Sequence, residues 1–312
     1  MKLSIVTTLY KSSAYITEFY DRATRVAAAV TSDYELVFVN DGSPDDALEK
    51  AVALHRRDTH VRVLDLSRNF GHHKAMMTGI EHARGDLVFL LDVDLEEQPE
   101  WLDEFRRVME QTGADVVYGV QTRRKGGAFE RLSGTIFYKG FNALLDHPIP
   151  ENSVTARLMT RRYVDSLITH RDREMTMAPL WAMTGYEQVP VGVEKKSRGE
   201  TSYGVRRRIA ALVDNITSFS NRPLVYIFYL GSFIMFASAC AAAVLIWKTE
   251  HGEVGVPGWP TLIVSIWFLG GITIFCLGVI GVYLSKIFTE TKDRPYTIVR
   301  ADYDHQARPQ RT

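Results

Sequence analysis

Residues 87–95 read LVFLLDVDL, an unbroken apolar run that stops at Asp92, with Asp94 two positions later. A short, fully apolar run is typical of a strand buried on both faces of a parallel sheet. This stretch therefore predicts an α/β fold in which a central strand ends in a pair of carboxylates.

Strand and helix signals alternate through the residues before this stretch. The strand-like runs cover residues 3–9, 35–39 and 61–66, and helical spacing covers residues 15–30, 45–57 and 74–83. Such alternation predicts βαβ units and a mostly parallel sheet. Ligands of these sheets bind beyond the carboxyl ends of the strands. Because Asp41 follows the second run, we expect two acidic strand ends at one edge of the sheet.

Asp92 and Asp94 can converge on a single cation if the chain turns after the strand. Carboxylate oxygens suit Mg²⁺ or Mn²⁺, which characteristically bridge to substrate phosphates. The alternative is a solvated acidic turn in front of a helix at residues 100–110. The position after a buried strand favours the metal site and a nucleoside diphosphate ligand. The sequence has no G-x-x-x-x-G-K-[ST] and no strand-linked G-x-G-x-x-G, which excludes a P-loop or dinucleotide site.

Charge is balanced overall but unevenly distributed. The 312 residues include 37 Lys and Arg against 37 Asp and Glu, which disfavours a nucleic-acid partner. Residues 81–115 hold 11 acidic and 3 basic residues, whereas residues 195–222 hold 7 basic and 2 acidic ones. With only 2 cysteines, the chain is not a disulfide-built secreted scaffold.

Residues 224–247 and 261–285 contain no charged residue, and each stretch is long enough for a helix to cross a bilayer. The alternative is a pair of core helices in a soluble domain. The connection at 248–260 has one Lys and no Arg, while basic residues flank the pair on its other side. The positive-inside rule then predicts a hairpin in the cytoplasmic (inner) membrane, with the N-terminal region and the C-terminal tail cytoplasmic.

Two further segments combine apolar and basic residues at helical spacing, namely residues 132–145 and the juxtamembrane residues 203–222. Both are expected to lie at the membrane surface. The predicted organisation is a catalytic domain (1–202), an amphipathic helix (203–222), a transmembrane hairpin (223–288) and a C-terminal tail (289–312).

Several motifs together resemble the family 2 glycosyltransferases of GT-A fold: VNDGSPD at 39–45, SRNFGH at 67–72, ARGD at 83–86 and LDVDL at 91–95. Membrane-proximal motifs, among them GET at 199–201, SFS at 218–220 and KDRP at 292–295, are similar to those of polyprenyl-phosphate glycosyltransferases. That group includes dolichol-phosphate-mannose synthase-like and bacterial O-antigen-modifying enzymes. The resemblance implies inverting transfer of a sugar from a nucleotide diphosphate, UDP in the first instance, to undecaprenyl phosphate by a homo-oligomer.

The resemblance also assigns roles to residues. It implies nucleotide contacts for Thr8, Tyr10, Asp41 and Asp92, and metal ligation by Asp92, Asp94 and Glu96. It implies contacts to phosphate for Arg123, Arg124, Lys125, Lys196 and Arg198. The residues it places at the reaction itself are Asp94, Arg157, Thr155 and Glu151, with Arg157 at the acceptor phosphate, where a guanidinium fits well.

Some positions depart from the family pattern. Thr8 and Lys11 stand where Pro and Asn are usual, which leaves the nucleotide base open. Thr155 stands where many relatives have Asp. Because a phosphate monoester is already largely dianionic near neutral pH, such a nucleophile needs positioning more than proton removal.

Parts of the sequence are also compatible with other functions. A catalytically degenerate scaffold or flippase partner would also explain Thr155. A processive polysaccharide synthase is disfavoured by the lack of Q-x-x-R-W, and a soluble nucleotidyltransferase by the two uncharged stretches. The motifs leave the sugar open.

Overall fold

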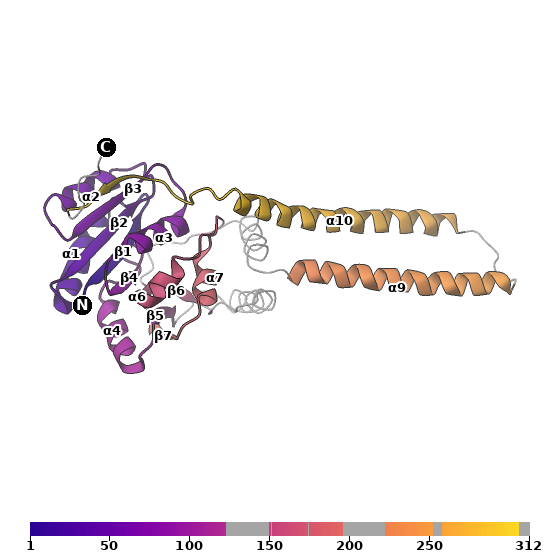
Figure 1. The fold of residues 1–312 in the computed structure, drawn as a ribbon, viewed down its shortest axis with the longest axis horizontal. Coiled ribbons are helices and arrows are strands. Elements are labelled where there is room, and N and C mark those ends of the chain that lie inside the picture. Colours follow the sequence, from indigo (N-terminus) through magenta and orange to yellow (C-terminus); the bar gives the residue numbers. More distant parts are fainter. Residues whose placement is uncertain (123–149, 151, 174, 196–221, 252–257, 306–312) are drawn as a thin grey trace. The chain divides into compact units, whose positions relative to one another are not determined.

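The computed structural model describes residues 1–122, 150, 152–173, 175–195, 222–251 and 258–305. These residues form two compact units, an α/β sheet domain and a pair of long helices (Figure 1). Each unit is described separately below.

The sheet domain is built on one mixed sheet with the strand order β7-β5-β6-β4-β1-β2-β3-β8. Its strands are β1 (Leu3–Leu9), β2 (Tyr34–Asn40), β3 (Val61–Leu66), β4 (Leu87–Leu90), β5 (Val116–Gln121), β6 (Ser153–Thr160), β7 (Gln188–Val193) and β8 (Val299–Tyr303). Its helices are α1 (Ile16–Val30), α2 (Ala47–His55), α3 (His72–His82), α4 (Trp101–Thr112), α6 (Arg161–Leu167) and α7 (Met177–Met183). The centre is parallel, since β1 pairs with β2 and β4 in parallel and β2 pairs with β3 likewise. The predicted α/β fold with a mostly parallel sheet is confirmed.

Both faces of the parallel strands are covered, which explains why their sequences are apolar without alternation. The apolar sides of α1, α2 and α4 pack with strand residues in one core. On the opposite face α3 crosses β1 and β2 so closely that a Cβ at Gly79 would lie 2.5 Å from Val6 Cγ1. Only glycine allows that approach.

The predicted element boundaries are close to the observed ones, and residues 61–66 form β3 without any shift. The predicted helix at 45–57 is shorter, because Asp45 lies outside α2 and its side chain accepts hydrogen bonds from the backbone N–H groups of Ser13 and Ala47. The predicted helix at 74–83 begins earlier, at His72, directly after Gly71 with its φ of +101°.

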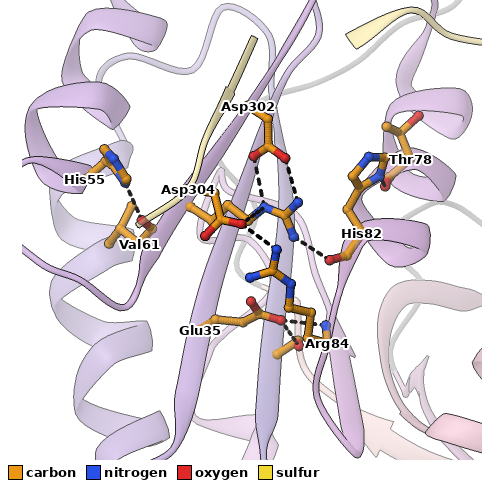
Figure 2. Close-up of polar contacts among 10 residues, drawn as sticks. Glu35, His55, Val61, Thr78, His82, Arg84, Asp302 and Asp304 are labelled. Carbon is orange, nitrogen blue, oxygen red and sulfur yellow. Dashed lines mark hydrogen bonds and ion pairs between the residues drawn. The ribbon is translucent and has the colours of Figure 1, made fainter. Parts of the chain in front are cut away.

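The C-terminal residues, predicted only as a tail, supply the edge strand β8, which pairs antiparallel with β3. Charged side chains fix this pairing (Figure 2). Asp302 accepts two hydrogen bonds from the guanidinium of Arg62, at 3.0 and 2.7 Å, and Arg84 donates to Asp304. The chain that follows the long helices is thus part of the sheet domain.

The second unit consists of α9 (Arg222–Glu250) and α10 (Trp259–Thr291), which contact one another. Among the described residues, one helical segment is long and apolar enough to cross a membrane, Ser265–Thr291 in α10, with a mean hydropathy of 2.1. In α9 the stretch Arg222–Ile234 is apolar but shorter. One of the two predicted spans therefore meets the criterion of length and composition, and the two-helix hairpin stays a prediction.

Large apolar side chains on both long helices are exposed, among them Phe236 at 70% and Trp267 at 78%. Soluble monomers rarely expose apolar surface of this extent, and helices that are apolar all round are normally covered by protein or lipid.

We predict that Asp302→Asn loosens β8. The change removes a charge-assisted, two-bond contact to a nearly buried arginine, which costs about 1–3 kcal/mol of unfolding free energy. Hydrogen exchange should accelerate at residues 299–303 and along the neighbouring edge of β3. Asp103→Asn, on the exposed side of α4, is the matched control and should leave exchange at β8 unchanged. Equal protection of β8 in both variants would show that the strand does not depend on this contact.

Candidate active site

The candidate site lies where β1, β2 and β4 end and β6 begins. Because β4 and β6 are antiparallel with Leu90 opposite Arg157, the same register places Asp92 opposite Thr155. The sheet thus brings together residues that are 63 positions apart in the chain.

Asp92 is held from two sides. Thr155 Oγ1 donates a hydrogen bond to Asp92 Oδ2 at 3.2 Å, and His72 Nε2 lies 3.3 Å from Asp92 Oδ1. The other ring nitrogen of His72, Nδ1, lies 3.0 Å from Thr8 Oγ1. A line of polar side chains, Thr8–His72–Asp92–Thr155, therefore runs across the neighbouring strands β1, β4 and β6.

A buried carboxylate, Glu97, ties the same elements together beneath this line. Its side chain is 0% exposed and accepts hydrogen bonds from the backbone N–H of Thr155 at 2.9 Å and of Asp92 at 3.4 Å. Lys195, just after β7, places its Nζ 3.5 Å from a carboxylate oxygen of Glu97 and 3.5 Å from one of Glu96. Glu97 is therefore the common partner of three segments of the site.

The pKa values of these groups follow from burial and from their neighbours. Burial raises the pKa of Glu97 to about 7, and the charge of Asp92 adds to this. Burial also raises the pKa of Asp94. For Asp92 burial acts in the same direction, but His72, Lys195 and Thr155 outweigh it and its pKa is lowered. Burial opposes the charged form of His72, yet the contact with Asp92 raises the pKa of this ring.

Asp41 lies at the end of β2, as predicted, and is almost completely buried. Its two carboxylate oxygens accept hydrogen bonds from the backbone N–H of Phe70 at 2.7 Å and of Gly71 at 3.0 Å. Burial outweighs these bonds and raises its pKa. Asp41 thus anchors the loop that leads into α3, and its predicted nucleotide contact stays a prediction. Tyr10, beyond β1, is 48% exposed.

Arg157 lies in β6, two residues beyond Thr155, and its side chain is fully buried. The guanidinium donates to the backbone carbonyls of Thr155 at 3.2 Å and Val154 at 3.5 Å, and it faces the ring of Trp181. Within the described part of the chain Arg157 forms no ion pair. Burial lowers the pKa of its guanidinium to about 9.

Arg157 also lines a pocket of about 300 Å³ between α7 and the strands β5, β6 and β7. The polar and aromatic residues of its wall include Tyr118, Ser153, Arg157, Trp181, Tyr186 and Gln188. The indole Nε1 of Trp181 is buried and has no hydrogen-bond partner among the described residues. The pocket therefore offers a cation and unused polar capacity beside aromatic rings.

Asp92 and Asp94 are the candidate ligands of a divalent ion. Asp92 Oδ1 is buried and accepts no hydrogen bond from the described residues, although His72 Nε2 lies 3.3 Å from it. One oxygen of Asp94 accepts from the backbone N–H of Glu96 at 2.9 Å, so each carboxylate keeps lone pairs for coordination. No three His, Cys, Asp or Glu side chains converge as a metal site in the described ranges. Since Mg²⁺ is commonly held by one or two carboxylates and completed by substrate phosphates and water, the aspartate pair fits such an ion. Glu96 already faces Lys195, which competes with its predicted ligand role.

Six predicted site residues lie outside the described residues: Arg123, Arg124, Lys125, Glu151, Lys196 and Arg198. The same holds for the predicted surface helices at 132–145 and 203–221. Their roles stay predictions.

Three residues of the site were not predicted in these roles, namely His72, Glu97 and Lys195. The signal for Glu97 was a fourth acidic position, directly after Glu96, and for Lys195 a lysine two residues after a strand. His72 belongs to a motif that carried the family resemblance, but nothing local in the sequence indicates its contact with Asp92.

Comparison with known proteins agrees with this geometry. Residues 4–168 match the family described as Glycosyl transferase family 2. A Mycobacterium tuberculosis protein with a provisional glycosyltransferase name is 54% identical over 97% of this chain and 89% of its own length. The bactoprenol glucosyl transferase of Shigella phage SfII is 32% identical over 97% of this chain and 99% of its own length. The chain therefore belongs to glycosyltransferase family 2, which confirms the prediction of a glycosyltransferase.

Solved structures are more distant. The glucosyl-3-phosphoglycerate synthase of Mycobacterium tuberculosis, determined with Mn²⁺ and UDP-glucose, is 16% identical, with a TM-score of 0.46 over 69% of this chain and 77% of its own. A likeness at this level says nothing of the ligands that this chain binds.

We predict that Glu97→Gln changes how stability depends on pH. The pKa of Glu97 is raised from 4.5 to about 7, so the folded chain holds this proton more tightly than the unfolded chain. The stability that this group contributes is present below about pH 4.5 and is lost as the pH rises through about 7. Glutamine cannot titrate, so the stability of the variant relative to the wild type should increase as the pH rises between those two values.

The measurement is thermal unfolding of the full chain in detergent, without divalent ions, across this range. Glu104→Gln, an exposed position of α4, is the matched control and should follow the wild type. If the melting temperatures of Glu97→Gln and the wild type change with pH in the same way, Glu97 does not titrate between these values.

Proposed function

We propose that this chain is an inverting glycosyltransferase that moves a sugar from a nucleotide diphosphate, in the first instance a UDP-sugar, to undecaprenyl phosphate in the cytoplasmic membrane. The product would be a polyprenyl-phosphate-linked sugar for the synthesis or modification of cell-surface glycans. The observation that carries the proposal is the buried Arg157, which lines a pocket, has no ion pair among the described residues and lies on β6 two residues from Thr155, the partner of Asp92.

A buried cation without a counter-ion is costly, because it has lost its hydration without gaining a charged partner. An anion in the pocket would remove this cost. A phosphate group fits best, since its oxygens match the fork of N–H donors on a guanidinium. Tyr118, Trp181 and Tyr186 give the same pocket an aromatic wall, which suits a ligand that is part polar and part apolar.

On the other side of Thr155, Asp92 and Asp94 face the position expected for the donor. A divalent ion bound there would neutralise the charge that develops on the leaving diphosphate. In the transfer, a phosphate oxygen of the acceptor attacks the anomeric carbon. The new carbon–oxygen bond forms as the bond to the diphosphate breaks, and the nucleoside diphosphate leaves with the electron pair. A dianionic phosphate has no proton to lose, so Thr155 in place of Asp does not block this step.

The phage relative supports the acceptor class, since that protein is a bactoprenol glucosyl transferase and it aligns over 97% of this chain. The sugar remains to be found by experiment, and the homo-oligomer implied by the family resemblance belongs to the proposal as well.

The sheet topology supports a membrane hairpin. Strand β8 follows α10 in the chain and pairs with β3, which precedes α9. Both strands must lie on the same side of any membrane, so the chain between them crosses an even number of times. If α10 crosses, a second segment must cross as well, and α9 has the length for it, with 29 residues.

We predict that the two ends of the chain lie on the cytoplasmic side and that the connection after α9 lies on the other. A fluorescent protein fused to the C-terminus should fluoresce, and alkaline phosphatase inserted after Glu250 should be active. The reverse fusions serve as controls and should be silent. An active C-terminal phosphatase would contradict both the hairpin and the pairing of β8 with β3 in the membrane-bound protein.

The activity is tested by mass spectrometry of lipids. Membranes that contain the chain are incubated with undecaprenyl phosphate and, one at a time, with UDP-, GDP- and dTDP-linked sugars. We expect a lipid-linked sugar phosphate from at least one donor. Asp94→Asn should abolish it, and Arg157→Lys should raise the KM for the acceptor about tenfold or more, because the two-pronged contact is lost.

Arg25→Lys, an exposed arginine of α1, is the matched control for Arg157→Lys and should behave as the wild type. The absence of a lipid-linked product with every donor would contradict the proposal and favour the scaffold function.

A further inference from the structure

His72 is the first residue of α3 and lies between two strand ends. Its Nε2 faces Asp92 Oδ1 at 3.3 Å and its Nδ1 faces Thr8 Oγ1 at 3.0 Å. Both ring nitrogens are therefore in use, and the ring spans the gap between β1 and β4. The proposed transfer reaction has no role for it so far.

The contact with Thr8 determines which ring nitrogen of His72 carries the proton. A hydroxyl can donate to Nδ1, which leaves the proton of a neutral ring on Nε2. An Nε2 lone pair pointed at a carboxylate would be repulsive, so the proton belongs on the nitrogen that faces Asp92. In the neutral ring with Nδ1 accepting from Thr8, the Nε2–H of His72 is therefore directed at Asp92.

The backbone around His72 is fixed independently of the ring. Gly71, at a φ of +101°, and Phe70 donate their N–H groups to the buried carboxylate of Asp41. Asp41 in turn donates its own N–H to the carbonyl of Leu9 at 3.0 Å. The start of α3 is therefore anchored to the ends of β1 and β2 whatever side chain stands at position 72.

Asp92 has a polar partner beside each of its oxygens: Thr155 donates a hydrogen bond to Oδ2, and His72 Nε2 lies 3.3 Å from Oδ1. A carboxylate at the end of a strand can rotate freely unless such groups fix its plane. Metal-binding carboxylates and imidazoles are commonly held by outer partners of this kind, and removing one typically costs 10–100-fold in affinity or activity.

We propose that His72 is a positioning residue that fixes the Asp92 carboxylate for a divalent ion and the donor diphosphate. The proposal rests on the proposed use of Asp92 toward that ion, but not on the identity of the sugar acceptor. The competing explanation is that His72 only stabilises the start of α3.

Two substitutions separate these explanations. The side-chain amide of Gln reaches about as far as imidazole Nε2, and that of Asn about as far as Nδ1. His72→Gln can therefore keep the donor toward Asp92, while His72→Asn can keep only the contact with Thr8. A role confined to α3 would not favour Gln, because a side chain that serves only the start of the helix has no need to reach Asp92.

The test measures the binding of Mn²⁺ to the full chain in detergent by electron paramagnetic resonance. The nucleotide sugar and the lipid acceptor are both left out. We expect His72→Asn to weaken Mn²⁺ binding about tenfold or more and His72→Gln to stay within about threefold of the wild type. Thr8→Val should weaken binding by a smaller factor, since it removes only the group that orients the ring. Thermal unfolding of each variant checks that the chain is folded.

In steady-state transfer, His72→Asn should raise the KM for the nucleotide sugar more than it lowers kcat, because saturating ion and donor pull Asp92 into place. Equal or tighter Mn²⁺ binding by His72→Asn would overturn the proposal, as would equal losses in the Asn and Gln variants or no Mn²⁺ binding by the wild type. If the Mn²⁺ results hold but no lipid-linked product forms, the acceptor assignment fails and the role of His72 stands.

Discussion

Burying a carboxylate at the end of a strand requires compensation, and the candidate site is organised around the compensation of Asp92. His72, Lys195 and a hydrogen bond from Thr155 favour the ionised form of this carboxylate against the effect of burial. These partners come from α3, from the segment after β7 and from β6. The groups that stabilise one carboxylate therefore belong to three different elements at this edge of the sheet. Glu97 lies beneath, and burial together with the charge of Asp92 outweighs its contacts with Lys195 and two backbone N–H groups, so its pKa is raised to about 7.

The second buried charge has the opposite sign and lies on the same strand. Thr155 and Arg157 are two residues apart on β6, so both side chains project from one face of the sheet. One contacts the acidic cluster and the other lines the aromatic pocket. This arrangement suits a reaction that joins two phosphate-bearing substrates, one bound through a cation and the other through a guanidinium. The uneven charge of the sequence already pointed to such a division.

The sequence was sufficient for the features that depend on local pattern. The apolar run at 87–91, with Asp92 after it, predicted a buried strand and its acidic end, and the alternation before it predicted the parallel sheet. It was not sufficient for contacts that depend on register. In the sequence Glu97 is one more acidic residue in an acidic stretch. Its contact with the backbone N–H of Thr155 exists only because β4 pairs with β6. Strand β8 was missed because its pairing depends on Arg62 and β3, which precede it by more than two hundred residues.

In the proposed function, the buried Arg157 binds the phosphate of the lipid acceptor. The most direct test measures how tightly the full chain, in detergent and without a nucleotide sugar, binds a short-chain polyprenyl phosphate compared with the uncharged polyprenol of the same length. We expect the phosphate to bind at least about tenfold more tightly, a difference of about 1.4 kcal/mol. Equal affinities would contradict it, because the pocket would then recognise only the hydrocarbon.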